Sequence, residues 1–246
     1  MAQETPSPLQ GKRIALTRPD WPELADLLER NSARVVHIPL IRIAPPSRDE
    51  LAGLVGNVYQ WVAFTSANAV RAVVAHAEGL ALLRGARIAC VGDATARVAR
   101  DSGLLVDLQP QRPHVKGLLE AFGAISGGGN VLFPRGELAP STLAEGLKAQ
   151  GFSVDDPVVY RTVPDMDGMK LLAQEVNALD AVVLASPSAV HNAAEACGQA
   201  LRKPALFSIG PSTSAALGGH KLRPAGEALE PTAEAMLQAM LTYRWP

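Results

Sequence analysis

The chain repeats itself at the scale of a domain. Two apolar, β-branched segments, Pro39–Pro45 and Pro157–Pro164, are each bounded by prolines, and they begin 118 residues apart. Segments of this kind are typical of short strands. Three more pairs recur at offsets of 117 to 120 residues: Arg18 with Arg135, Ser66–Val70 with Ser186–Val190, and Gly92–Thr95 with Gly210–Thr213. A solenoid repeats every ~20–50 residues, so a period of this length predicts two similar domains.

Within each half, apolar runs alternate with stretches of helical periodicity. Trp61–Thr65, Arg87–Val91 and Asp180–Ala185 have the composition of buried strands. Glu23–Asn31 has leucines at spacings that place them on one helical face. This alternation predicts an α/β fold in which each half is a parallel sheet covered by helices.

Composition excludes several classes of function. A formal net charge of −1 offers no bulk positive field for nucleic acid or an anionic membrane. No run reaches the ~18 consecutive apolar residues of a membrane span. Met1–Gln10 is polar and has no apolar signal region, so we expect a cytoplasmic protein with a disordered lead-in. Two distant cysteines and five histidines without ligand spacing predict no metal site.

Six loops follow predicted strands and consist of small polar residues, glycine, proline or arginine. In parallel sheets such loops share the ligand-binding edge, and helix starts present N–H groups to anions. We therefore expect a multiply anionic small molecule. The candidate binding residues are Thr17, Arg18, Ser66, Asn68, Thr95, Arg135, Ser186, Ser188, Gly210 and Ser212. The alternative is that the hydroxyl groups are ordinary helix caps and the arginines are surface charges.

Five motifs occur in order along nearly the whole chain. They are Thr17–Pro19, Phe64–Val70, Val91–Thr95, Val159–Thr162 and Ile209–Thr213. As an ordered set they resemble the uroporphyrinogen-III synthase (HemD) family. The resemblance implies an enzyme of tetrapyrrole (heme) biosynthesis, a lyase that cyclises the linear tetrapyrrole hydroxymethylbilane to uroporphyrinogen III. The last pyrrole ring, ring D, is inverted and water is lost, without a metal or organic cofactor.

The resemblance also implies an architecture. Two flavodoxin-like α/β lobes with parallel sheets are joined by a two-stranded linker, and the site lies between them. One lobe is expected to comprise residues 1–39 and 165–246, and the other residues 45–157, with linker strands at 40–44 and 158–164. We expect a monomer, because no apolar stripe remains after the helices are packed, and a transient contact with hydroxymethylbilane synthase.

Two residues are catalytic candidates on the same resemblance. Tyr160 matches the important tyrosine of the family, and Thr213 matches its important threonine. Thr95 matches a second threonine, whereas Asn68 is neutral where some members have arginine. A phenol can donate a proton to the leaving hydroxyl, and Thr213 is expected to act through its hydroxyl and cap contacts. From the residues alone, Tyr160 could equally be a strand aromatic packed on the sheet.

Two other classes of protein remain open. A non-catalytic two-lobed binding protein for an anionic small molecule would have similar loops, because helix N-termini bind anions in many folds. The ordered motifs and the tyrosine on the crossing strand favour the enzyme. A pair of flavodoxin-like regulatory domains would need an acidic pocket at the strand ends, where only Asp93 is available.

Overall fold

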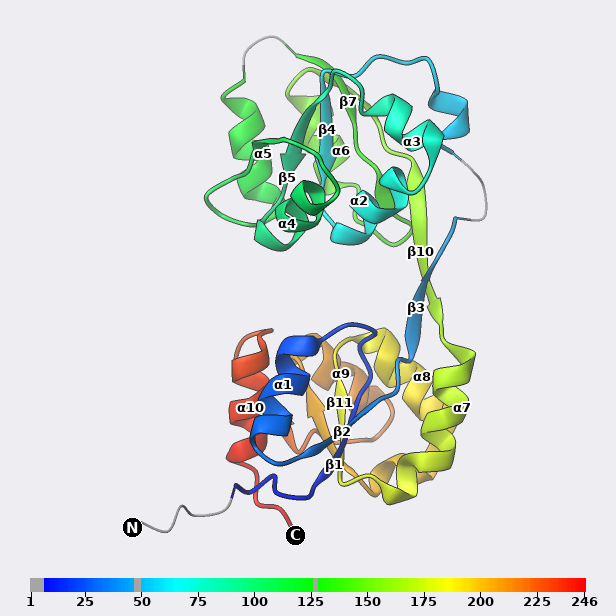
Figure 1. The fold of residues 1–246 in the computed structure, drawn as a ribbon, viewed down its shortest axis with the longest axis vertical. Coiled ribbons are helices and arrows are strands. Elements are labelled where there is room, and N and C mark those ends of the chain that lie inside the picture. Colours follow the sequence, from blue (N-terminus) through cyan, green and yellow to red (C-terminus); the bar gives the residue numbers. More distant parts are fainter. Residues whose placement is uncertain (1–6, 47–49, 126–127) are drawn as a thin grey trace. The chain divides into compact units, whose positions relative to one another are not determined.

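The chain forms two compact units. The computed structural model describes residues 7–46, 50–125 and 128–246 (Figure 1). Unit 1 contains the chain up to Arg42 together with Val163–Pro246, and unit 2 contains Ile43–Thr162.

Unit 1 is built on a five-stranded parallel sheet in the order β13-β12-β11-β1-β2. Its strands are β1 (Arg13–Leu16), β2 (Arg34–His37), β11 (Ala181–Leu184), β12 (Ala205–Ser208) and β13 (Gly226–Glu227). The central strand β11 is apolar and buried along its whole length, as expected for a parallel sheet covered on both faces.

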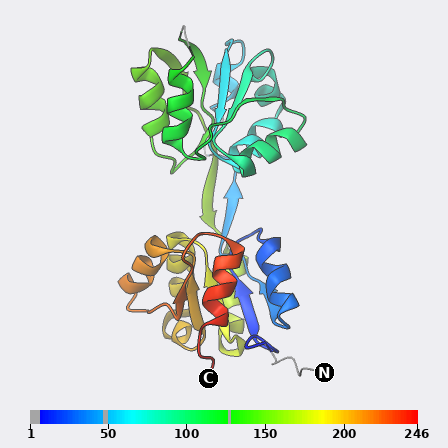
Figure 2. The same cartoon turned by 90° about the vertical axis from the view of Figure 1, so that its left-hand side faces the viewer.

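Helices cover both faces of this sheet (Figure 2). The helices are α1 (Pro22–Arg30), α7 (Met166–Glu175), α8 (Pro187–Cys197), α9 (Pro211–Gly219) and α10 (Ala233–Leu241), with 3-10 turns at Val176–Ala178 and Gly198–Arg202. Leu28 of α1 and Met236 of α10 belong to the core on one face. Leu172 of α7, Val190 of α8 and Leu217 of α9 belong to the core on the other face.

Unit 2 repeats this design in the order β6-β5-β4-β7-β9, again all parallel. Its strands are β4 (Trp61–Phe64), β5 (Arg87–Cys90), β6 (Val106–Leu108), β7 (Gly129–Leu132) and β9 (Phe152–Asp155). The helices α2 (Ala67–Val74), α3 (Ala77–Leu82) and α4 (Asp93–Asp101) cover one face, and α5 (Val115–Gly123) and α6 (Thr142–Ala149) cover the other.

The two strand orders become identical when the sequence repeat is applied. It pairs β4 with β11, β5 with β12, β6 with β13, β7 with β1 and β9 with β2. Each strand then has the same neighbours in both units. The predicted α/β fold with two similar parallel-sheet lobes is therefore confirmed.

A third sheet has the order β3-β10-β8, formed by β3 (Ile41–Ala44), β10 (Val158–Pro164) and β8 (Arg135–Gly136). The chain passes from one unit to the other within β3 and within β10. The two-residue strand β8 was not anticipated. It pairs in parallel with β10 and places Gly136 opposite Tyr160.

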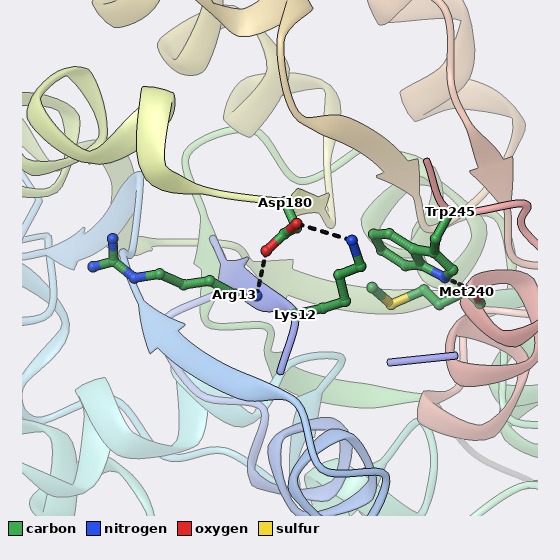
Figure 3. A network of polar contacts seen from close by, with 5 residues as sticks. All are labelled: Lys12, Arg13, Asp180, Met240 and Trp245. Carbon is green, nitrogen blue, oxygen red and sulfur yellow. Dashed lines mark hydrogen bonds and ion pairs between the residues drawn. The ribbon is translucent and has the colours of Figure 1, made fainter. Parts of the chain in front are cut away.

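Asp180 ties together three segments of unit 1 at the start of β11 (Figure 3). Its carboxylate accepts hydrogen bonds from the Lys12 ammonium at 3.2 Å and the Arg13 backbone N–H at 2.8 Å. The Lys12 ammonium lies 5.4 Å from the centre of the Trp245 ring. The Trp245 indole donates to the Met240 carbonyl at 3.0 Å. These contacts fix the C-terminal segment beside the first strand.

Three local predictions need correction. The disordered lead-in was predicted to reach Gln10, yet Leu9 is fully buried in the unit 1 core; residues 1–6 lie outside the described residues. Apolar residues at helical spacing predict a helix over Ser47–Val58, but the described part of this segment contains only a 3-10 turn, Ala52–Leu54. Residues 47–49 also lie outside the described residues. The sequence also predicts a helix from Leu138, but it begins only at Thr142, because proline at 140 disfavours the helical conformation of the residue before it. Among the described residues, no helix combines the length and apolar character needed to cross a membrane.

Candidate functional site

In unit 1, the predicted residues follow three neighbouring strands. Thr17 and Arg18 follow β1, Ser186 and Ser188 follow β11, and Gly210 begins the segment after β12. Because these strands are adjacent and parallel, the loops lie along one edge of the sheet.

Two of these hydroxyls are used inside the unit. Thr17 is buried, and its hydroxyl donates to the Val183 carbonyl at 2.7 Å. The Ser186 hydroxyl accepts from the Ala189 N–H at 3.1 Å and caps α8. Both hydroxyls therefore have structural partners: Ser186 is a helix cap, and Thr17 bonds within the core.

Three other candidates face solvent. Ser188 and Ser212 lie exposed in the first turns of α8 and α9. Arg18 is also exposed, with its guanidinium carbon 5.3 Å from the centre of the Trp21 ring. Stacking on an indole supports a guanidinium without neutralising it. Arg18 is thus a cation available to an anionic ligand.

Thr213 differs from all of these. It is 0% exposed, and its hydroxyl oxygen is buried without a hydrogen-bond partner among the described residues. Helix α9 has Gly210 at its N-cap and no side-chain cap, so the expected cap contacts of Thr213 are absent. A buried hydroxyl without a partner costs about 1–3 kcal/mol, so this hydroxyl does not stabilise unit 1 through any contact within the described residues.

In unit 2, the loops again follow three adjacent strands, β5, β4 and β7. Thr95 lies in the first turn of α4, three residues after the N-cap Gly92, and is buried. Thr213 occupies the same position relative to Gly210. The repeat therefore provides each unit with a buried threonine at a helix start that has no side-chain cap.

Tyr160 is brought to the start of α2. Its hydroxyl donates to the Ser66 side-chain oxygen at 3.1 Å. The same oxygen accepts from the Asn68 backbone N–H at 3.1 Å and caps the helix. Tyr160 is half-buried, so a phenol held by one neutral hydroxyl remains open to a second partner.

Sequence reasoning missed the residue that admits this ring. A Cβ atom on Gly136 would lie 2.7 Å from Cζ of Tyr160 and 2.9 Å from its hydroxyl oxygen, closer than real contacts allow. Gly136 is one of 21 glycines, and nothing in the sequence distinguishes it. Its requirement follows from the pairing of β8 with β10.

The two remaining polar candidates have charged neighbours. Arg135 pairs with Asp156, with 2.9 Å between Nε and the carboxylate oxygen. Part of its charge is therefore balanced within the unit. The Asn68 side-chain oxygen accepts from the guanidinium of Arg71 at 3.2 Å. Arg71 is exposed and supplies a cation beside the neutral Asn68. Sequence reasoning did not select Arg71, although residues three apart on a helix are neighbours and the spacing from Asn68 could have indicated it.

Metal and thiol chemistry find little support in these residues. Within 7–46, 50–125 and 128–246, no three histidine, cysteine or acidic side chains gather as a metal-binding group. Burial raises the pKa of the Cys90 and Cys197 thiols to about 11, which disfavours the nucleophilic thiolate. The candidate residues instead offer hydroxyl groups, backbone N–H groups and arginines.

Comparison with known proteins gives consistent matches. The family model described as "Uroporphyrinogen-III synthase HemD" matches residues 22–238. The uroporphyrinogen-III synthase of Synechococcus elongatus is 30% identical over 233 residues, covering 84% of this chain and 86% of that protein. The matched region includes loops from both units.

Solved structures agree on the fold. The uroporphyrinogen-III synthetase of Helicobacter pylori has a TM-score of 0.65 at 20% identity, covering 95% of this chain and all of that one. A mutant uroporphyrinogen III synthase from Thermus thermophilus has a TM-score of 0.56 at 20% identity, covering 94% and 97%. With the model matching most of the sequence, the chain belongs to the uroporphyrinogen-III synthase HemD family.

Proposed function

We propose that this protein is a lyase that cyclises hydroxymethylbilane to uroporphyrinogen III, with inversion of ring D and loss of water. One observation carries the proposal: the family model spans residues 22–238, and so includes strand-end loops of both units, all except the loop after β1. The polar character of those loops, with their hydroxyl groups, helix starts and arginines, suits a substrate that carries eight carboxylates.

Substrate binding is assigned to the strand-end loops. Helices α2, α4, α8 and α9 all begin at these loops, and helix N-termini favour anions through free N–H groups and the helix dipole. Arg18 and Arg71 are exposed cations beside two of the loops. We propose that these helix starts and cations bind the carboxylates of the substrate, because such local donors suit a polyanion even in a chain with a net charge near zero.

Tyr160 is proposed as the proton donor. Its phenol would donate to the terminal hydroxyl of the substrate, which leaves as water and creates a cationic azafulvene. Ring D then attacks at its substituted carbon to form a spiro intermediate, which fragments and recloses in the inverted orientation with loss of a ring proton. The proton given at the start is matched by the proton lost at closure. Ser66 supports this role by holding the Tyr160 hydroxyl at 3.1 Å.

Thr213 and Thr95 are proposed to hold the substrate in the geometry of ring inversion. The unpartnered hydroxyl of Thr213 can bond to a ligand without breaking an internal hydrogen bond. Simple closure without inversion is chemically easier, so the enzyme must restrict how the last ring approaches. Oriented hydroxyls and N–H groups are suited to that restriction.

Freshly prepared hydroxymethylbilane tests the activity. Wild-type protein should give mainly uroporphyrin III after oxidation of the product, and heat-inactivated protein should give isomer I, the product of unassisted closure. Isomer I alone from the native protein would refute the enzyme. Tight substrate binding without conversion would identify the alternative, a non-catalytic binding protein.

Four properties of the working protein are part of the same proposal. We propose a cytoplasmic monomer that needs no cofactor and contacts hydroxymethylbilane synthase transiently. Light scattering after gel filtration should give the mass of one 25.9 kDa chain. Chelator should leave the rate unchanged, and adding the synthase should shorten the lag before product appears.

A further inference from the structure

A chain of three hydrogen-bonded side chains lies beside the start of α9. The hydroxyls of Ser208 and Ser214 are 2.7 Å apart, and the Ser214 hydroxyl donates to the carboxylate of Glu227. Glu227 can only accept when ionised, so Ser208 donates to Ser214 and Ser214 donates to Glu227. These three side chains connect β12, α9 and β13.

The register of the sheet produces this arrangement. Ser208 and Glu227 are direct partners in the pairing of β12 with β13. Side chains at paired positions point to the same face of a sheet, and both reach Ser214 on the helix above. Ser208 is fully buried, whereas Glu227 is exposed. The row of hydrogen-bonded side chains therefore extends from the core to the surface.

Helices α9 and α1 of unit 1 begin without a side-chain cap, unlike the other helices of this unit. Helices α7, α8 and α10 have side-chain caps from Asp165, Ser186 and Thr232. Helix α9 begins at Gly210, which has no side chain to serve as a cap. The contacts of Ser214 provide side-chain attachment for its first turn.

We propose that Ser214, held by Ser208 and Glu227, is a positioning residue that orients Thr213 for the reaction. This inference rests on the proposed function. Thr213 precedes Ser214 directly, so fixing Ser214 on the sheet fixes the rotation of the first turn. The Thr213 hydroxyl makes no hydrogen bond of its own within the described residues, so its direction depends on the helix that carries it. The direction of the buried Thr213 hydroxyl is thereby held through its neighbour.

Kinetics of Ser214 and Glu227 variants provide the first test. Ser214→Ala should lower kcat about tenfold and change KM less than about twofold, because orientation rather than binding is lost. Ser214→Thr keeps a hydroxyl and should restore much of the rate. Glu227→Gln keeps an acceptor and should lie close to wild type, whereas Glu227→Ala should resemble Ser214→Ala. Thr242→Ala, which removes an exposed hydroxyl at the end of α10, is the matched control.

A double-mutant cycle with Thr213→Val separates positioning from general damage. If Ser214 acts through Thr213, Ser214→Ala should change kcat little once Thr213 has become valine. Equal tenfold losses in both backgrounds would overturn the proposal. So would a Ser214→Ala enzyme with normal kcat.

The methyl resonance of Thr213 gives a readout that needs no turnover. In the free protein, Ser214→Ala should shift or broaden this resonance, while Thr242→Ala should not. An unchanged resonance would overturn the proposal even in an active enzyme. If Ser214→Ala shifts the resonance but the wild-type protein forms only isomer I, the proposed function is refuted, while the effect of Ser214 on Thr213 stands.

Discussion

The Tyr160 hydroxyl donates to the side-chain oxygen of Ser66 at 3.1 Å, although the residues are 94 positions apart. Ser66 also caps α2. The link joins β10, in which the chain passes from unit 2 to unit 1, to the helix start that follows the carboxyl end of β4. Tyr160 is therefore held in a defined orientation by a neutral partner.

Replacing Tyr160 by phenylalanine should slow turnover substantially. General acids typically contribute at least about 100-fold, and we expect a kcat loss of that order because the ring is retained but its proton is not. KM should change little. Rates of uroporphyrinogen III formation are compared with those of Tyr243→Phe, which alters a tyrosine packed on Phe207. A Tyr160→Phe enzyme with near-normal rate and product would remove Tyr160 as the main acid.

Gly136→Ala should damage both stability and rate. The new methyl group would lie 2.7 Å from the Tyr160 ring, so the ring or β8 must move. Overpacking of this kind costs about 1–3 kcal/mol, and the displaced phenol should lose its bond to Ser66. Denaturant unfolding and kcat measure the two effects. Gly53→Ala is the control, because a Cβ there meets nothing within 4 Å; equal behaviour of the two variants would contradict the close packing.

Thr213→Val should separate stability from activity. The buried hydroxyl has no hydrogen-bond partner in the described part of the chain, so replacing it with a methyl group should leave the free energy of unfolding unchanged or raise it by about 1 kcal/mol. Activity should fall, because the ligand loses a hydroxyl. Thr213→Ala should also lower activity, but it leaves a small cavity.

Thr17→Val is the comparison variant for the free energy of unfolding of Thr213→Val. The Thr17 hydroxyl donates to the Val183 carbonyl at 2.7 Å, so its loss should destabilise the protein by about 1 kcal/mol. Equal losses of stability in Thr17→Val and Thr213→Val would show that the Thr213 hydroxyl has an internal partner. Unchanged kinetics in Thr213→Val would contradict its role.

Tyr59 should make the protein sensitive to alkali. Burial and the bond from its hydroxyl to Asp155, at 2.6 Å, raise the pKa of Tyr59 from 10.0 to about 12. The folded state then holds the proton more tightly than the unfolded chain. The resulting contribution of about 2–3 kcal/mol is complete below pH 10 and disappears as the pH rises towards 12.

Unfolding free energies measured from pH 8 to 11.5 test this. Wild type should lose stability above pH 10 more steeply than Tyr59→Phe, which lacks the titrating group. Tyrosinate absorbance should show one chromophore fewer near pH 12 in the variant. Parallel pH profiles would place the alkaline sensitivity elsewhere.

Much of the fold is visible in the sequence, because parallel strands buried on both faces have continuous apolar runs. Trp61–Thr65, Arg87–Val91 and Asp180–Ala185 each contain an observed strand. Short edge elements lack that signal: β8 and β13 have two residues each, and only pairing with a neighbour defines them. Helix α3 was also missed, since its six residues directly follow α2 and carry glycine.

The candidate site was less accessible to prediction. Sequence motifs identify Ser66, Tyr160 and Thr213, but not which hydroxyl is free. Thr17 and Thr213 look alike in sequence, yet one donates to a carbonyl and the other has no partner within the described residues. The partner of Tyr160 and the need for Gly136 depend on pairing between distant segments. The catalytic and binding roles themselves remain predictions.

The division of the chain also sets an order for its synthesis. Unit 2 is one continuous stretch, so all of its strand pairings become possible once residue 162 has left the ribosome. Strand β1 must wait for β11, which ends at Leu184 and is 167 residues downstream in register. Until β11 has been made, the apolar side chains of β1 and α1 cannot pack into the complete sheet of unit 1. Slow pairing between distant segments leaves apolar surface exposed and favours aggregation of a nascent chain. Strand β1 and helix α1 thus precede the whole of unit 2 in the chain, yet their sheet can be completed only after unit 2 has been made.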